Sequence, residues 1–108
     1  MMKMAWTCLI AAGLFEIGWP VGLKLAQTPG KTVVGVLFAG SCMIVSGYLL
    51  YLAQRHIPMG TAYAVWTGIG AAGTFVLGIF LYGDPTGAMR ILAVLLIISG
   101  VILLKLAH

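Results

Sequence analysis

The sequence predicts an all-α integral membrane protein with four transmembrane helices in one domain, residues 1–108. Three observations predict this class. Hydrophobic residues make up 62% of the chain and charged residues 7%, whereas soluble domains carry about 25% charged residues. The apolar residues gather in four runs of about 20 residues, the length that crosses a bilayer. The joints between the runs are short, and each contains Pro and Gly, which end helices.

The four expected helices differ in what interrupts their apolar sequence. They occupy residues 4–23, 33–52, 61–82 and 91–106. The first contains a single charge, Glu16, the second is interrupted only by hydroxyl groups, and the third is rich in glycine. The fourth is aliphatic apart from Lys105 near its end and from Ser99 and Gly100, a small-residue surface that suits helix–helix packing. A signal peptide is the competing interpretation of the first run, but the run is too long and contains a charge and a proline.

The second acidic residue, Asp84, lies in the joint before the fourth helix. Pro85 follows it, and Asp with Pro at the next position is typical of a helix N-cap. We therefore expect Asp84 to open the fourth helix as a structural cap, at the membrane interface.

Composition also excludes several classes of function. The six basic residues are scattered, so nucleic-acid binding has no basic patch to support it. Cys8 and Cys42 lie in apolar runs, which favours buried small residues over a disulfide. His56 and His108 do not have the spacing of metal ligands. No nucleophile has a nearby base, so we expect no enzyme activity, no metal and no cofactor.

The basic residues indicate an unusual topology. If the N-terminus is cytoplasmic, Lys3, Arg55 and Lys105 are cytoplasmic as well. The opposite side then holds Lys24, Lys31 and Arg90. Orientation normally follows an excess of Lys and Arg on one side, and here the balance is three against three. The hypothesis is that the chain inserts in both directions and pairs with an inverted copy of itself, as an antiparallel homodimer of dual topology.

Glu16 is the strongest candidate for function. At about 1.5 Å per residue it lies roughly 18 Å into a hydrocarbon layer of about 30 Å, where a carboxylate is costly unless it is protonated, paired or hydrated. Its helical neighbours include Gly13, Trp19 and Pro20. Pro20 cannot donate to the carbonyl of Glu16, so we expect a kink and a free carbonyl there. Carboxylate, carbonyl and indole form a candidate cation site; the alternative is a glutamate that fills a packing defect.

The second and third helices supply the other candidate site residues. Tyr63, Trp66 and Gly70 share one helical face, with Thr67 beside them. Tyr63 and Trp66 carry hydrogen-bond donors and aromatic faces, although interface anchoring is the alternative. The glycines from Gly68 spell G-x-G-x-x-G without the strand that a dinucleotide fingerprint needs, so close helix packing is the better explanation. Ser46 could donate to a buried carboxylate or to the local backbone.

These motifs resemble the small multidrug resistance family of four-helix bacterial exporters, over essentially the whole chain. The resemblance includes Gly13-x-x-Glu16-x-x-Trp19, the stretch from Pro58 to Ala71 (PMGTAYAVWTGIGA), and the C-terminal Gly100 and Lys105. The Trp one turn after the Glu, together with the third-helix stretch, is similar to the guanidinium-exporter subtype. The position of Pro20 is more usually Ala in that subtype, and a kink there could widen the site.

The resemblance implies an antiparallel homodimer in the bacterial inner membrane, with one glutamate from each subunit at a central site. The family pattern makes Glu16 the carboxylate for proton and substrate, with Trp19, Ser46, Tyr63 and Trp66 lining the site. From their positions in the first and third helices, Gly13, Pro20, Thr67 and Gly70 are further candidates that line or gate it. Lys105 matches a lysine of the family to which no role is assigned. The expected partners are a guanidinium-like organic cation, protons and the lipid bilayer.

The expected activity is proton-coupled export, because cation and protons would compete for the same carboxylates. Two other functions stay open. One is export of bulky quaternary ammonium compounds, and the other is a non-transporting subunit in which Glu16 pairs with a partner protein. A passive channel is disfavoured because no ring of polar residues repeats along a helix. The sequence also leaves open whether guanidinium, guanylurea or biguanides are carried, and whether the partner is identical or a paralogue.

Overall fold

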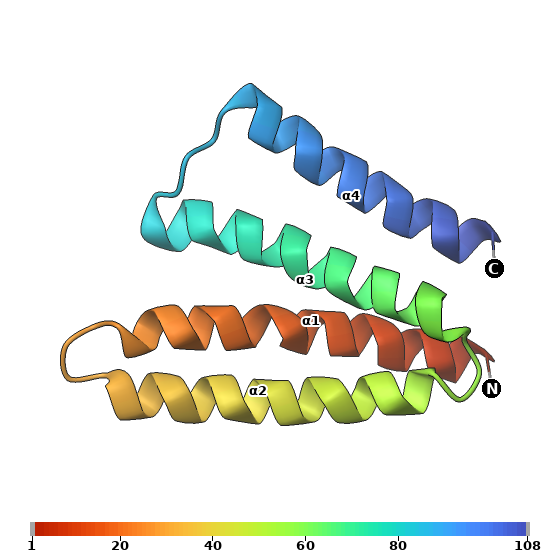
Figure 1. The fold of residues 1–108 in the computed structure, drawn as a ribbon, viewed down its shortest axis with the longest axis horizontal. Coiled ribbons are helices and arrows are strands. Elements are labelled where there is room, and N and C mark those ends of the chain that lie inside the picture. The colour runs from red at the N-terminus through yellow and green to blue at the C-terminus, as the bar shows by residue number, and fades with distance from the viewer. Residues whose placement is uncertain (1, 108) are drawn as a thin grey trace.

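The structure is a computed structural model that describes residues 2–107 and contains four helices over that range (Figure 1). The helices are α1 Met2–Ala26, α2 Thr32–Ala53, α3 Met59–Tyr82 and α4 Ala88–Ala107. Each is long and apolar enough to cross a membrane, which confirms the prediction of four transmembrane helices. Each predicted span lies inside an observed helix. His108 lies outside the described residues.

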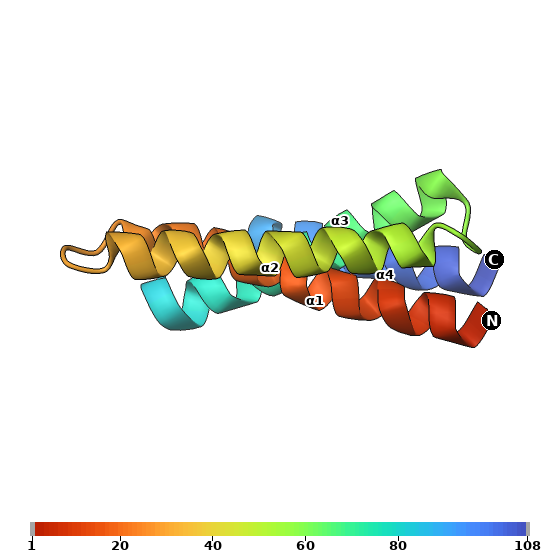
Figure 2. The same ribbon diagram turned by 90° about the horizontal axis from the view of Figure 1, so that it is seen from below.

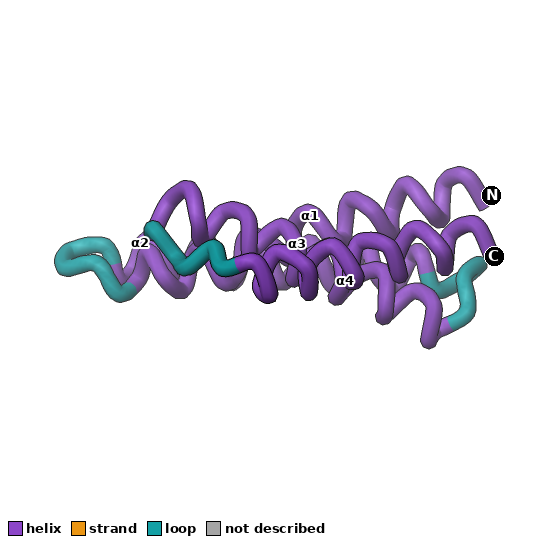
Figure 3. The backbone as a smooth tube through the Cα atoms, turned by 90° about the horizontal axis from the view of Figure 1, so that it is seen from above, coloured by secondary structure: helices purple, strands orange, loops and turns teal. Residues whose placement is uncertain are grey.

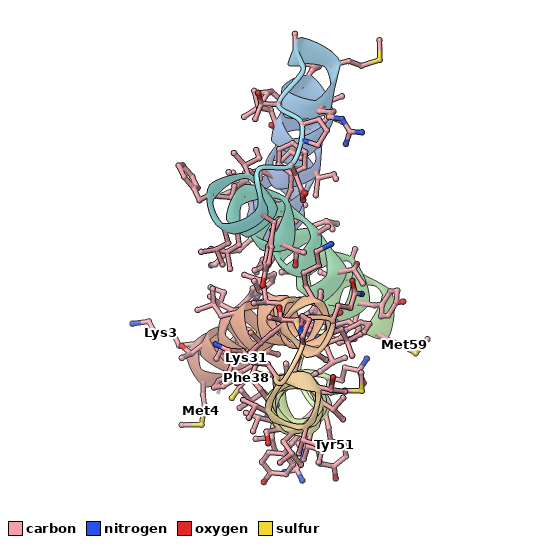
Figure 4. The ribbon with its side chains drawn as sticks, turned by 90° about the vertical axis from the view of Figure 1, so that its left-hand side faces the viewer. Lys3, Met4, Lys31, Phe38, Tyr51 and Met59 are labelled. Carbon is pink, nitrogen blue, oxygen red and sulfur yellow. The ribbon has the colours of Figure 1, made fainter. Side chains whose placement is uncertain are left out.

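The helices lie side by side in a single layer, in the order α2, α1, α3, α4 (Figure 1). The extents of 44 × 34 × 17 Å give a layer little thicker than one helix with its side chains, about 10–12 Å. Figure 2 shows the layer edge-on, with α3 crossing α1 obliquely. Figure 4, seen along the helices, shows them stacked in one column, with Met4, Tyr51 and Met59 pointing away from it. Both broad faces of the layer are therefore open to lipid or to another copy.

The loops and termini divide between two ends of the layer (Figure 3). The α1–α2 and α3–α4 loops lie at one end, here called the two-loop end. The α2–α3 loop lies at the other, with both ends of the chain (Figure 1). This second end is here called the terminus end. The main cluster of buried residues is near the terminus end, where Trp6 and Leu9 of α1 pack with Val65 of α3 and Ile57. This packing fixes the first half of α3, which carries Tyr63 and Trp66.

Glycines allow α1 to approach its neighbours closely. A side-chain carbon at Gly35 of α2 would lie 2.6 Å from Ala26 Cα and from the Gly22 carbonyl oxygen of α1, far too close for any residue but glycine. α1 itself continues through Pro20 without a break. None of the described residues of α4 is buried, so α4 packs along the edge of the layer through small contacts such as that of Val101 with Gly68.

The prediction that Asp84 caps the start of the fourth helix is wrong. Gly83 ends α3 in the left-handed conformation, with φ of 65°, which glycine adopts without strain. The backbone N–H of Asp84 then donates to the carbonyl of Gly78 at 3.1 Å, closing the end of α3. α4 begins only at Ala88, and the Ile91 N–H donates to the Gly87 carbonyl at 3.0 Å. Asp84 therefore belongs to the end of α3.

Candidate functional site

Glu16 lies on the side of α1 that faces α3, and its side chain is half-buried. It packs against Gly70, where an added side-chain carbon would overlap the Glu16 Cγ. Glycine at position 70 is therefore what gives the carboxylate its room. Among residues 2–107, no side chain donates a hydrogen bond to Glu16 and no basic group forms an ion pair with it. The carboxylate is available to an external donor, a proton or a cation.

A cavity of about 430 Å³ adjoins this carboxylate. Four of the predicted site residues line it. Its lining consists of Glu16, Pro20, Thr67, Gly70, Ala71, Thr74 and Phe75. Thr74 was missed by the sequence interpretation, although it follows Thr67 by seven residues, a spacing that returns to the same helical face. The cavity thus combines one acid and two hydroxyls with otherwise apolar walls.

Ser46 and Trp66 form a hydrogen-bonded network that joins three helices but does not reach Glu16. The Trp66 Nε1–H donates to Ser46 Oγ at 2.8 Å, and the Ser46 hydroxyl donates to the Ala12 carbonyl at 2.7 Å. Ser46 is completely buried. In a regular helix the Ala12 carbonyl also accepts the N–H of Glu16. The network therefore fixes the turn of α1 that carries the carboxylate, so these two residues position it rather than contact it.

The structure does not bring the other candidates into the same cavity. Tyr63 is 56% exposed, and its ring centroid lies 5.5 Å from that of Trp66. Its hydroxyl makes no hydrogen bond with any residue in the described range. Trp19 is half-buried and lies outside the lining of the Glu16 cavity. Gly13 packs against Ile69, so it serves the α1–α3 contact.

Thr67 is held by its own helix. Its hydroxyl donates to the Tyr63 carbonyl at 2.7 Å, one turn earlier. The oxygen of this hydroxyl keeps lone pairs that can accept a hydrogen bond from a ligand in the cavity. Cys8 is half-buried and Cys42 buried, both with free thiols, and within residues 2–107 no cluster of His, Cys, Asp and Glu could hold a metal ion.

Four membrane-spanning helices in one layer, with a lone carboxylate beside a cavity between two of them, define a small multi-pass membrane protein with a polar site inside the bilayer. Comparison with known proteins is consistent with this class. The chain belongs to the small multidrug resistance family, whose model, described as Small Multidrug Resistance protein, matches residues 4–97. The predicted family resemblance is confirmed, and the chain is a multi-pass protein of the bacterial inner membrane.

Several relatives match nearly the full length of the chain. A guanidinium exporter of Yersinia pseudotuberculosis is 46% identical over 104 residues, 96% of this chain and 99% of the relative. The guanidinium exporter of Escherichia coli K12 is 45% identical, over 96% of this chain and 98% of the relative. That of Citrobacter freundii is 43% identical with the same coverage. The relatives carry the name of the subtype that the sequence motifs indicate.

Proposed function

We propose that this chain is a proton-coupled antiporter that exports guanidinium and small guanidinyl cations. The observation that carries the proposal is the Glu16 carboxylate, which has no donor among residues 2–107 and lines a cavity with apolar walls. A carboxylate in such surroundings gains by binding either a proton or a cation, and it cannot hold both with full strength. Exchange of one for the other couples the two flows without a separate coupling site.

The choice of a guanidinium-like substrate rests on matching chemistry and on the relatives. A guanidinium group is planar and presents paired N–H donors, which match a carboxylate bidentately. The hydroxyl oxygens of Thr67 and Thr74 in the same cavity can accept further hydrogen bonds. A quaternary ammonium ion has no N–H to donate, so it would use none of these acceptors. Relatives that are 43–46% identical over nearly the whole chain are guanidinium exporters by name.

The proposed working form is an antiparallel homodimer. The Glu16 cavity is lined from two helices of a single layer, and within residues 2–107 no second layer covers it, so a second copy would supply the missing wall and a second glutamate. A binding site inside a bilayer needs such a wall, because lipid tails cannot satisfy polar groups. In a dimer, Tyr63 and Trp19 could meet a carboxylate that they do not touch within one protomer. The balanced basic residues described above support inverted pairing.

The test is guanidinium-evoked current across membranes that contain purified protein. The native chain should give a transient current, because the two glutamates of the proposed dimer would exchange two protons for one cation, which moves net charge. Glu16→Gln should abolish the current, because the amide keeps the shape of the carboxylate but binds neither a proton nor a cation by charge. Glu16→Asp, which keeps the charge, should retain exchange with a changed pH range. Proton-driven transport that persists in Glu16→Gln would contradict the mechanism. A response to tetraalkylammonium without one to guanidinium would indicate the multidrug subtype, and silence with both would indicate a non-transporting subunit.

A further inference from the structure

A second cavity, of about 170 Å³, lies at the two-loop end and continues the Glu16 cavity. Its walls include Lys24, Tyr82 and Asp84, and it shares Pro20 and Thr74 with the Glu16 cavity. Glu16, Pro20 and Lys24 are spaced four residues apart, which places them along one face of α1. The two cavities therefore follow one groove between α1 and α3, from the middle of the membrane to its edge.

The end of α3 holds the Asp84 carboxylate in this groove. Gly83, with φ of 65°, turns the chain back, and the Asp84 N–H is bound to the Gly78 carbonyl at 3.1 Å. The carboxylate rests directly against Gly78, where any side chain would collide with the Asp84 Oδ2. Within residues 2–107 no basic group forms an ion pair with this carboxylate, and no side chain donates to it. Asp84 and Glu16 are the only two acidic residues of the chain, and both line this groove.

The cavity already holds a cation, and that cation belongs to the protein. The Lys24 Nζ lies over the ring of Tyr82, 5.8 Å from its centroid, within the range of a cation–π interaction. Lys24 does not pair with Asp84, so the aromatic ring rather than the carboxylate holds the ammonium group. Lys24 is exposed, so its flexible side chain can move into water.

We propose that Tyr82 and Asp84 form an outer site for organic cations at the mouth of the groove, and that Lys24 is a tethered competitor for it. An entering cation stacks on the Tyr82 ring, donates N–H groups to Asp84 and displaces Lys24, before it moves along the groove to Glu16. In the inverted copy of the proposed dimer, the equivalent outer site faces the other side of the membrane, and the departing cation passes it there. This inference rests on the proposed function, because it names the entrance to the same path.

The test compares the guanidinium concentration that gives half-maximal current in reconstituted membranes. Asp84→Asn removes the charge with little change of shape and should raise that concentration roughly threefold to tenfold, the effect of one partly solvated charge. Lys24→Gln should lower it by roughly threefold, because the competitor is removed. Lys31→Gln is the matched control: it removes one positive charge at the same end, outside the cavity, and should change the concentration by less than about twofold. Both lysine variants also carry Arg55→Gln at the terminus end, so that the number of basic residues stays equal at the two ends and the topology is not biased.

A further variant changes the space around the Asp84 carboxylate without changing its charge. Gly78→Ala keeps Asp84 but places a methyl group against its carboxylate, so it should shift the half-maximal concentration in the same direction as Asp84→Asn. Equal effects of Lys24→Gln and Lys31→Gln on the half-maximal concentration, or a native response in Asp84→Asn, would overturn the outer site. If the native chain still gives a current that depends on Glu16, the proposed function stands in that case. A native chain that gives no guanidinium current would overturn both.

Discussion

A single hydroxyl group, that of Ser46, connects α1, α2 and α3. Ser46→Ala leaves the Trp66 N–H without its acceptor, so we expect a loss of stability of about 1 kcal/mol, the usual value of one hydrogen bond within a membrane bundle. Thermal unfolding in detergent measures this change. Ser41→Ala is the control, because the exposed Ser41 donates only within its own helix, to the Leu37 carbonyl at 2.9 Å. If both variants unfold like the native chain, the network does not fix the helices.

The Glu16 site shows which residues can be predicted from sequence and which cannot. Glu16 can be found because a charge in an apolar run has a cost that needs no neighbour to recognise. The role of Ser46 cannot be found in this way, because its acceptor is a backbone carbonyl 34 positions earlier in the sequence. That contact depends on α2 lying next to α1, which the apolar pattern of the spans does not specify. Lining residues such as Thr74 lie between these cases, since helical spacing from Thr67 predicts their face.

The contact between α1 and α3 depends on the small surface of α3 at Gly70. Gly70→Ala should cut guanidinium transport roughly tenfold to a hundredfold, because the new methyl group displaces the Glu16 side chain and misplacing a reactive group by about 1 Å has effects of this size. Helix propensity acts in the opposite direction, since Ala favours a helix over Gly by roughly 0.5–1 kcal/mol. Reconstituted transport and thermal unfolding, measured together, separate the two effects.

The matched variant is Gly40→Ala, at a position in α2 where an added side-chain carbon meets no atom within 4 Å. It should keep native transport. Transport that is unimpaired in Gly70→Ala would show that Glu16 does not need the space at position 70, and the assignment of this glycine to the site would fail.

At the scale of helices, the apolar runs predicted that four helices exist and their order along the chain, whereas the residues in the turns determine where each helix ends. The runs predicted spans that lie inside all four observed helices. The end of α3 differs because two local signals compete around Asp84. Asp followed by Pro favours an N-cap, while Gly83 favours a left-handed end that captures the next N–H. The glycine determines the structure there, which leaves the carboxylate in the groove and moves the start of α4 to Ala88.

At the scale of the molecule, the structure groups the basic residues as the topology argument requires. Both ends of the chain and the α2–α3 loop lie at the terminus end, and the α1–α2 and α3–α4 loops lie at the other (Figure 1). Arg55, at the terminus end, donates to the Tyr51 hydroxyl at 3.3 Å, and this hydrogen bond raises the pKa of Arg55, so its charge persists at any physiological pH. Arg55 is therefore a fixed charge in the balance of three basic residues at each end.

Such a balance should be sensitive to a single charge. Reporters fused to the C-terminus, each active on only one side of the membrane, should both respond in the native chain. Lys31→Gln leaves three charges against two and should bias the N-terminus toward the cytoplasm, whereas Arg55→Gln should bias it the other way. Each biased variant alone should lose guanidinium resistance in cells, and coexpression should restore it, because only the mixture supplies both orientations. A native chain that labels on one side, or full activity of either biased variant alone, would contradict inverted pairing.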